Sequence, residues 1–272
     1  MSTALINDIT IAYGDSGSGP ALVLVHGHPF DRTMWQPQVE WFSRAGWRVV
    51  TPDLRGYGES TVVPGKTTLE DFARDIVGLA DQLGIERFVL GGLSMGGQIV
   101  LEMVRLFPQR IRGLLLADTS APAESDAGKR HRNQLADRLL REGVESYAEE
   151  VLPRMLASYT IERHPDLAQF VLDMMRGTPA EGAAAALRGR AERPDYVELL
   201  ARIEVPTLVV VGRDDSFTPI SEAQLMYERI PNASLAVIEG AAHMPNLERP
   251  DEFNQALSTL LDAVSRESAE AQ

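Results

Sequence analysis

Short apolar runs recur along the chain, separated by stretches in which apolar residues return at helical spacing. The runs at 21–25, 111–117 and 207–211 are almost continuously apolar, as expected for strands buried on both faces of a parallel sheet. Further segments have strand character, at 4–7, 9–13, 47–51, 88–90 and 235–238. Because helical stretches lie between most of these runs, the pattern predicts a parallel α/β sheet with right-handed crossovers.

Helical spacing predicts the helices that flank this sheet. Thr67 and Glu70 have the spacing of a capping box, so one helix is expected to begin there and to run to about Leu83. The other expected helices of the core lie at 34–45, 99–106, 220–229 and 250–264.

The pattern changes between 121 and 202, where no segment has good strand character. Glycines and prolines divide this region into short helix-like pieces, and it lies between two of the buried strands. We therefore predict an all-helical cap over residues 121–202, inserted into a core made of residues 1–120 and 203–272. The cap is expected to cover the carboxyl edge of the sheet, where ligands bind in open α/β folds.

The stretch from Gly92 to Gly96 is the strongest candidate for chemistry. It has the form G-x-S-x-G, with Ser94 at its centre, an apolar run before it and a helical pattern after it. A strand, a tight turn and a helix are the context of a nucleophile elbow, in which glycines relieve crowding at the sharp turn. The serine hydroxyl then stands at a helix N-terminus, where the dipole and free N–H groups favour a developing oxyanion.

Composition narrows the classes of partner. The formal net charge of −13 makes nucleic acid and anionic membranes unfavourable partners, and we expect neither. The chain has no cysteine, which excludes disulfides and thiolate chemistry. Neither a signal peptide nor an apolar run of roughly 18 residues is evident, so a cytoplasmic location is the default expectation. A homo-oligomer is compatible with the sequence.

Five stretches carry a recognisable set of motifs: His26-Gly27-His28-Pro29, 53–60, 92–97, 212–219 and 240–245. Together they resemble the motifs of the α/β-hydrolase superfamily, along nearly the whole chain. The resemblance implies a mostly parallel eight-stranded sheet flanked by helices with an inserted helical cap, and it implies no cofactor and no metal. The branch that it is most similar to contains serine esterases, enol-lactonases and cofactor-free haloperoxidases (perhydrolases).

A serine hydroxyl needs a base within hydrogen-bond reach, and the base needs a carboxylate. Of the five histidines, His243 follows the last strand, where the superfamily keeps its base. The resemblance places the acid four residues before the loop proline, which favours Asp215 over Asp214. A less common arrangement of the superfamily uses the acid after the preceding strand, where Asp118 stands.

The oxyanion hole is expected to use backbone N–H groups. One should come from Met95, the residue after the nucleophile, and the resemblance assigns the second to His28 with Phe30 as the alternative. The side chain of His28 either faces the substrate or is satisfied within its loop.

The substrate pocket is the least defined part of the site. We assign Phe30, Met155, Tyr159 and Met244 to it. For the cap residues among them, packing of the cap interior is the more common role of such side chains. Three arginines offer a subsite for a substrate carboxylate, or form a solvated face: Arg188, Arg190 and Arg193. His131 and His164 have charged neighbours in the sequence and are interpreted as surface residues.

The leading hypothesis is hydrolysis of a small-molecule carboxylic ester or lactone through an acyl-enzyme. A carbon–carbon bond hydrolase of diketone ring-fission products keeps the same triad, but those relatives usually have tryptophan where this chain has Met244. Perhydrolase or haloperoxidase activity is a further alternative. A non-catalytic receptor on the same fold is the hypothesis from a different class.

Overall fold

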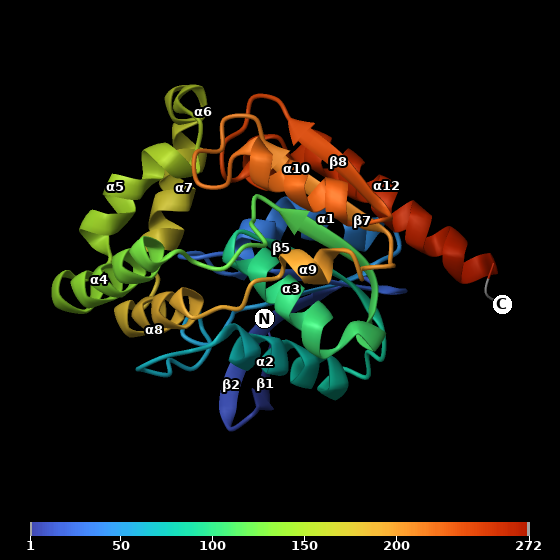
Figure 1. Cartoon of the computed structure of the whole chain (residues 1–272), viewed down its shortest axis with the longest axis horizontal. Coiled ribbons are helices and arrows are strands. Elements are labelled where there is room, and N and C mark those ends of the chain that lie inside the picture. Colours follow the sequence, from blue (N-terminus) through green and yellow to red (C-terminus); the bar gives the residue numbers. More distant parts are fainter. Residues whose placement is uncertain (1, 271–272) are drawn as a thin grey trace.

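The computed structural model describes residues 2–270, and it contains one eight-stranded sheet in the order β1-β2-β4-β3-β5-β6-β7-β8 (Figure 1). The strand β2 pairs antiparallel with both of its neighbours, and every pairing from β4 to β8 is parallel. The mostly parallel sheet predicted from the sequence is therefore confirmed. The strands are β1 (Ser2–Ile6), β2 (Ile9–Ser16), β3 (Ala21–Val25), β4 (Arg48–Pro52), β5 (Phe88–Leu93), β6 (Ile111–Ala117), β7 (Thr207–Gly212) and β8 (Ala233–Ile238).

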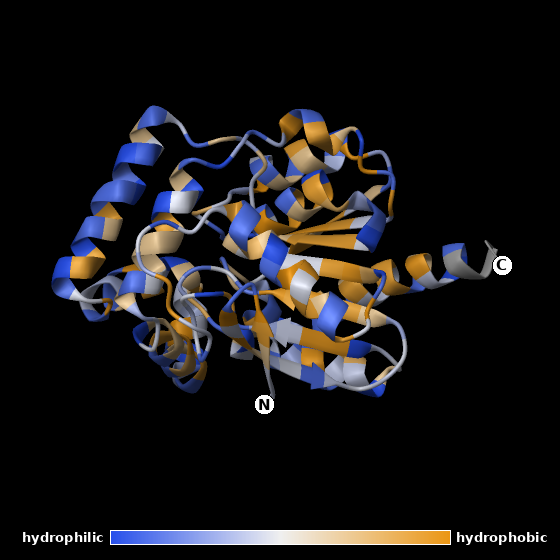
Figure 2. Ribbon diagram, turned by 90° about the horizontal axis from the view of Figure 1, so that it is seen from below, coloured by the Kyte–Doolittle hydropathy of each residue, from blue (hydrophilic) through white to orange (hydrophobic). Residues whose placement is uncertain are grey.

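Helices cover both faces of the sheet, which explains why β3, β5 and β7 are buried at every position. On one face the core contains residues of α2 (Leu69–Gln82), α3 (Met95–Leu106) and α10 (Ile220–Arg229). On the other it contains residues of α1 (Gln36–Arg44) and α12 (Pro250–Glu270). Figure 2 shows the apolar residues concentrated in the strands and on the helix sides that face them.

The region between β6 and β7 is helical, with most of its helices grouped at one end of the sheet (Figure 1). The helices α4 and α8 pack together, and α7 packs against both α5 and α6. These helices are α4 (Asp126–Glu142), α5 (Glu145–Met155), α6 (Ser158–Arg163), α7 (Pro165–Arg176) and α8 (Ala180–Ala191), with the short α9 (Val197–Leu200) leading to β7.

Two details of the helices differ from the sequence expectation. The capping box of α2 is formed by Thr68 and Asp71, one residue later than predicted, because the N–H of Thr67 instead donates to the carbonyl of Ala185 at 3.0 Å. The helix α4 begins at Asp126, before its first buried residue, because the Ser125 side chain caps it. A polar first turn carries no hydrophobic period, so the pattern could not reveal it.

The remaining short elements connect the core. They are the 3-10 turns η1 (Arg32–Trp35) and η2 (Pro108–Arg110), and α11 (Pro245–Glu248), which follows the loop after β8. None of the helices within the described part of the chain is long and apolar enough to cross a bilayer.

Candidate active site

Ser94 stands at the turn between β5 and α3 with φ 57° and ψ −117°, a backbone conformation that non-glycine residues rarely adopt. A Cβ at Gly92 would lie 2.3 Å from the carbonyl carbon of Gly96, and one at Gly96 would lie 2.2 Å from the Val25 carbonyl oxygen. The glycines of the motif are thus required by close backbone approach. The Thr119 hydroxyl donates to the Ser94 carbonyl at 2.7 Å and holds the turn.

His243 and Asp215 form a buried pair. The two side chains come from the loops after β8 and β7, and His243 Nδ1 lies 2.8 Å from Asp215 Oδ2. Since an ionised carboxylate only accepts, the proton of this bond is assigned to Nδ1, which leaves Nε2 for a partner in the cavity. Asp214, the alternative acid, is exposed and accepts a hydrogen bond from the Tyr159 hydroxyl at 2.7 Å.

The Asp215 carboxylate is held by several donors. Oδ1 accepts from the N–H groups of Phe217 at 2.7 Å and Thr218 at 3.2 Å, and Oδ2 also accepts from the Thr218 hydroxyl. Burial alone would raise the pKa of Asp215, but His243 and these donors outweigh it and lower that pKa. The carboxylate is therefore ionised at neutral pH and fixes the orientation of the imidazole.

The N–H groups expected to form an oxyanion hole differ in their partners. Met95 is the first residue of α3, where the helix itself leaves the N–H unpaired. Among the described residues, no hydrogen bond engages the N–H of His28, whereas the N–H of Phe30 donates to the Gly27 carbonyl at 3.1 Å. Of the two alternatives for the second donor, His28 is thus the one whose N–H is unengaged.

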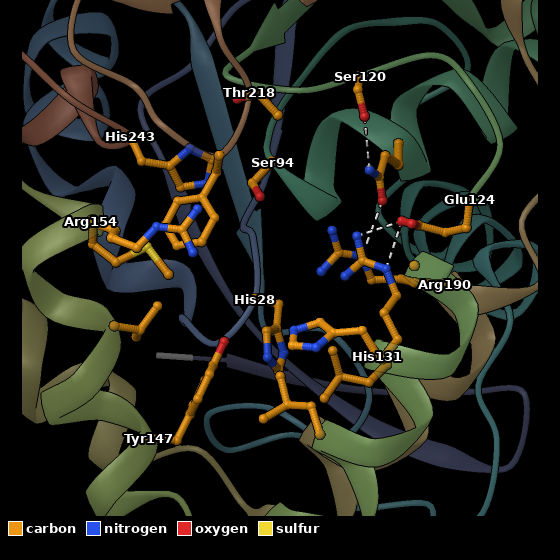
Figure 3. A pocket seen from close by; sticks show the side chains of 18 of the residues that line it. His28, Ser94, Ser120, Glu124, His131, Tyr147, Arg154, Arg190, Thr218 and His243 are labelled. Atoms are coloured by element: carbon orange, nitrogen blue, oxygen red, sulfur yellow. Dashed lines mark hydrogen bonds and ion pairs between the residues drawn. The ribbon is translucent and has the colours of Figure 1, made fainter. Parts of the chain in front are cut away.

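A cavity of about 430 Å³ opens above Ser94, between the sheet and the helices α4, α5 and α8. Figure 3 shows Ser94 and His243 on one side of it and Arg190 with Glu124 on the other. The remaining lining combines apolar and charged side chains of the cap with a few from the core, among them Gln98, Ser120, His131, Arg132, Leu135, Arg138, Tyr147, Glu150, Val151, Arg154, Leu187 and Phe217.

The residues assigned to the pocket from the sequence are placed differently. Met155 lines the cavity, but Phe30, Met244 and Tyr159 do not. Phe30 and Met244 are fully buried in the core beneath the site, and the hydroxyl of Tyr159 is engaged by Asp214. The sequence identified apolar and aromatic residues in the loops and in the helical region, but not whether their side chains point into the core or into the cavity.

The three arginines grouped in the sequence separate in the structure. Arg188 is directed to Asp137 at 2.8 Å, and Arg193 is buried against Glu124. Arg190 lines the cavity and is only 7% exposed, so the solvated-face interpretation is wrong for it. Its Nε donates to Gln98 Oε1 at 3.1 Å.

No carboxylate in the described residues pairs with Arg190. Burial, followed by the charges of Arg132 and Arg193, lowers the pKa of Arg190 well below its ordinary value. Since a guanidinium stays protonated in proteins, the cavity wall carries a cation that an anionic ligand would stabilise. Glu124 does not supply this, because it is shared by Arg132 and Arg193.

His28 contributes a second polar group to the cavity. The hydroxyl of Tyr57 lies 2.8 Å from His28 Nδ1, and the sequence did not suggest this contact. The other ring nitrogen, Nε2, is buried without a hydrogen-bond partner among the described residues. Burial and then the charges of Arg190 and Arg132 lower the pKa of His28 well below 6.5, so this imidazole is neutral.

The sequence did not predict most of the cavity lining, and Gln98 and His131 show why. Gln98 lies one turn after Ser94 on α3, and this i, i+4 spacing could have revealed it. His131 was interpreted as a surface residue; it is exposed but also lines the cavity mouth. His164 lies exposed between α6 and α7 and does not reach the cavity.

Comparison with known proteins places this site in a family. Residues 20–250 match the family model described as alpha/beta hydrolase fold. The chain belongs to this family. An esterase from Thermogutta terrifontis, solved with malate bound, superposes on this α/β hydrolase with a TM-score of 0.93 and 41% identity, covering 97% of this chain and 98% of the esterase.

Curated relatives span several activities. A 3-oxoadipate enol-lactonase of Acinetobacter baylyi is 31% identical over 247 residues, covering 91% of this chain and 90% of the enol-lactonase. A 2-hydroxy-6-oxononadienedioate/2-hydroxy-6-oxononatrienedioate hydrolase of Burkholderia vietnamiensis is 30% identical over 267 residues, covering 93% of this chain and 91% of that hydrolase. The α/β-hydrolase fold predicted from the motifs is confirmed.

Proposed function

We propose that this α/β hydrolase cleaves carboxylic esters or lactones through an acyl-enzyme formed on Ser94. The observation that carries the proposal is the convergence of an elbow serine and a buried His243–Asp215 pair on one cavity. The esterase and enol-lactonase relatives support the same reaction class. Fold alone would not decide it, because receptors and enzymes share folds.

The mechanism follows from the placed groups. His243 Nε2 takes the proton of the Ser94 hydroxyl while Oγ bonds to the carbonyl carbon, and the N–H groups of Met95 and His28 receive the oxyanion. Asp215 stabilises the imidazolium, which then protonates the departing alkoxide as the ester C–O bond breaks. In the second half, His243 activates a water that releases the acid from Ser94.

The Ser94→Ala variant tests this mechanism with p-nitrophenyl butyrate as the substrate. Because the nucleophile is removed, kcat should fall on the order of 10⁴-fold or more, while the melting temperature stays close to that of the wild type. Arg188→Gln, a change on the cap surface, is the matched control and should leave kcat unchanged. Turnover by Ser94→Ala at the wild-type rate would refute the acyl-enzyme.

The substrate class is argued from Arg190. A buried guanidinium without a carboxylate partner favours a substrate that brings its own anion, so the proposed substrates are esters or lactones carrying a free carboxylate. The structure of the Thermogutta esterase contains malate, an anion with free carboxylate groups. The neutral imidazole of His28 offers a further hydrogen-bonding group on the same cavity.

A matched pair of substrates tests this class: mono-p-nitrophenyl glutarate, which carries a carboxylate, and neutral p-nitrophenyl butyrate. The wild type should prefer the anionic ester in kcat/KM. Arg190→Gln should lose about 10- to 100-fold on the anionic ester, the range for a charged hydrogen bond, and little on the neutral one. An equal loss on both esters would contradict a carboxylate subsite.

The carbon–carbon bond hydrolase is the second candidate, supported by the Burkholderia relative. Its ring-fission substrates also carry carboxylates, so Arg190 does not separate the two reactions. Parallel assays with a lactone, an ester and a vinylogous 1,5-diketone ring-fission product would do so. We expect ester or lactone turnover to exceed carbon–carbon cleavage.

A further inference from the structure

Asp118 is a buried carboxyl group that the proposed mechanism does not use. It follows β6, with φ 43°, in the left-handed region that side chains other than glycine, asparagine and aspartate rarely occupy. The residue is 1% exposed, and its N–H donates to the Val210 carbonyl at 2.9 Å. The hydrogen bond to Val210 therefore holds this residue at the end of the sheet, between β6 and β7.

The two carboxyl oxygens of Asp118 differ in their hydrogen-bond partners. Oδ1 accepts the N–H of Gly212 at 2.9 Å, whereas Oδ2 is buried with no hydrogen-bond partner among the described residues. An unpaired buried carboxylate oxygen is costly, and a protonated one needs an acceptor. The side chain beside it is Asp215: one oxygen of each carboxyl and a ring nitrogen of His243 all lie within 4.8 Å of one another.

Two buried carboxyl groups with oxygens within 4.8 Å of each other tend to share one proton, because a second buried negative charge there is costly. Asp215 is the ionised member, since it accepts hydrogen bonds from His243, Thr218 and the Phe217 N–H. Burial and then the charge of Asp215 raise the pKa of Asp118 well above its ordinary value, and Glu248, next to the His243 loop, acts in the same direction. The proton belongs on Asp118.

We infer that Asp118 is a positioning residue of the triad: its carboxylic acid donates through Oδ2 to the Asp215 carboxylate and stands as a reserve acid for His243. This inference rests on the proposed function, because it assigns a role relative to the Ser94–His243–Asp215 set. When Asp215 is replaced by a neutral group, Asp118 releases its proton to solvent and accepts the Nδ1–H of His243.

The test is a double-mutant cycle on kcat for p-nitrophenyl butyrate. Asp118→Asn keeps a donor to Asp215 and an acceptor for the Gly212 N–H, so it should change kcat by no more than about threefold. Asp215→Asn should retain residual activity that Asp118→Asn removes, with a further loss of at least about 30-fold in that background. Wrong-tautomer histidine typically costs about 10⁴-fold, which sets the floor for the double variant.

Asp214→Asn is the matched control, because Asp214 neighbours Asp215 in sequence but is exposed and bonded to Tyr159. The change in kcat that Asp214→Asn causes should be the same in the wild-type and in the Asp215→Asn backgrounds. The residual activity of Asp215→Asn should also rise with pH through an ionisation that the Asp118→Asn/Asp215→Asn variant lacks. A merely structural role would shift melting temperature in each variant and leave both readouts unchanged.

Equal effects of Asp118→Asn in the wild-type and Asp215→Asn backgrounds would overturn the inference. So would loss of wild-type activity in a chelator with recovery on adding a divalent cation, because a metal held by Asp118, Asp215 and His243 would then explain the cluster. These failures are distinguishable from failure of the proposed function, in which Ser94→Ala keeps its activity.

Discussion

At residue 94 the backbone sets the chemistry as much as the side chain does. The positive φ of Ser94 is tolerated because Gly92 and Gly96 allow the strand and helix to close around it. Because these local requirements demand glycine at fixed positions around the serine, the elbow was predictable from the sequence. The same holds for Asp215 and His243, whose loops carry recognisable motifs and whose side chains are paired in the structure.

No comparable sequence motif shows whether a charged side chain is buried. Arg188 and Arg190 stand two residues apart in the same sequence context, yet one pairs with Asp137 at the surface and the other lines the cavity. Their difference depends on which face of α8 meets the core, a tertiary property. The hydrogen bond between His28 and Tyr57 likewise joins residues 29 positions apart and could not be derived from spacing.

The protonated state assigned to Asp118 has a consequence for stability. In the unfolded chain its carboxyl ionises near pH 3.9, whereas the folded protein keeps the proton to higher pH. The folded state therefore binds more protons above that value, and the free energy of unfolding falls as pH rises, by up to about 1.4 kcal/mol per pH unit, until the folded carboxyl ionises.

Asp118→Asn removes this dependence. Urea unfolding at pH 5, 6.5 and 8 should show a smaller loss of stability with rising pH in the variant than in the wild type. Asp214→Asn, which changes an exposed carboxylate, should follow the wild type. Parallel curves for the wild type and Asp118→Asn would show that the folded protein does not retain the Asp118 proton.

At the scale of elements, the Glu248 carboxylate links the start of α6 to the histidine loop, beside the direct hydrogen bond from the N–H of His243 to the Met155 carbonyl at 3.1 Å. Glu248, on α11, accepts the N–H of Ala242 at 2.7 Å through Oε1. Its Oε2 accepts the N–H of Ala157 at 2.9 Å and the hydroxyl of Thr160 at 2.6 Å, both where α6 begins. A motion of α6 is thereby coupled to the position of His243.

Glu248→Gln should weaken this link, because an amide has one acceptor oxygen and would turn its NH₂ toward a backbone donor. An unsatisfied buried donor costs about 1–3 kcal/mol, which calorimetry would record as a lower melting temperature. Thr160→Val removes only the hydroxyl bond and should cost less, about 0.5–1.5 kcal/mol. A Glu248→Gln variant as stable as the wild type would mean that the carboxylate does not hold the two elements together.

The elements themselves were largely predictable, because strands buried on both faces read as apolar runs and the core helices keep a hydrophobic period. The exceptions have physical causes. The first two turns of α4 are polar, and α6 is a six-residue helix too short to show a period. The cap boundaries drawn from the pattern at 121 and 202 remain a prediction about how the chain divides into folding units.

For the whole molecule, the charged side chains that line the cavity together carry a charge of the opposite sign to the net charge of the chain. The net charge is −13, yet four arginines and two glutamates line the cavity. The overall charge repels an anionic substrate at long range, and this repulsion is screened beyond about 10 Å at 0.1 M salt. The proposed contact between the substrate carboxylate and buried Arg190 would be screened much less.

Raising the salt concentration should therefore modestly increase kcat/KM for mono-p-nitrophenyl glutarate and leave p-nitrophenyl butyrate nearly unchanged. Initial rates from 0.02 to 0.5 M sodium chloride, roughly a fivefold change in Debye length, would measure this. A fall for the anionic ester would indicate that local attraction by the cavity arginines dominates association.

The central claim is that Ser94 is the nucleophile of the α/β hydrolase. It is tested most directly by labelling the folded protein with a fluorophosphonate and mapping the modified peptide by mass spectrometry. The account predicts one adduct, on Ser94, that is lost in Ser94→Ala and strongly reduced in His243→Ala. An unlabelled wild-type protein, or an adduct on any other residue that persists in Ser94→Ala, would contradict it.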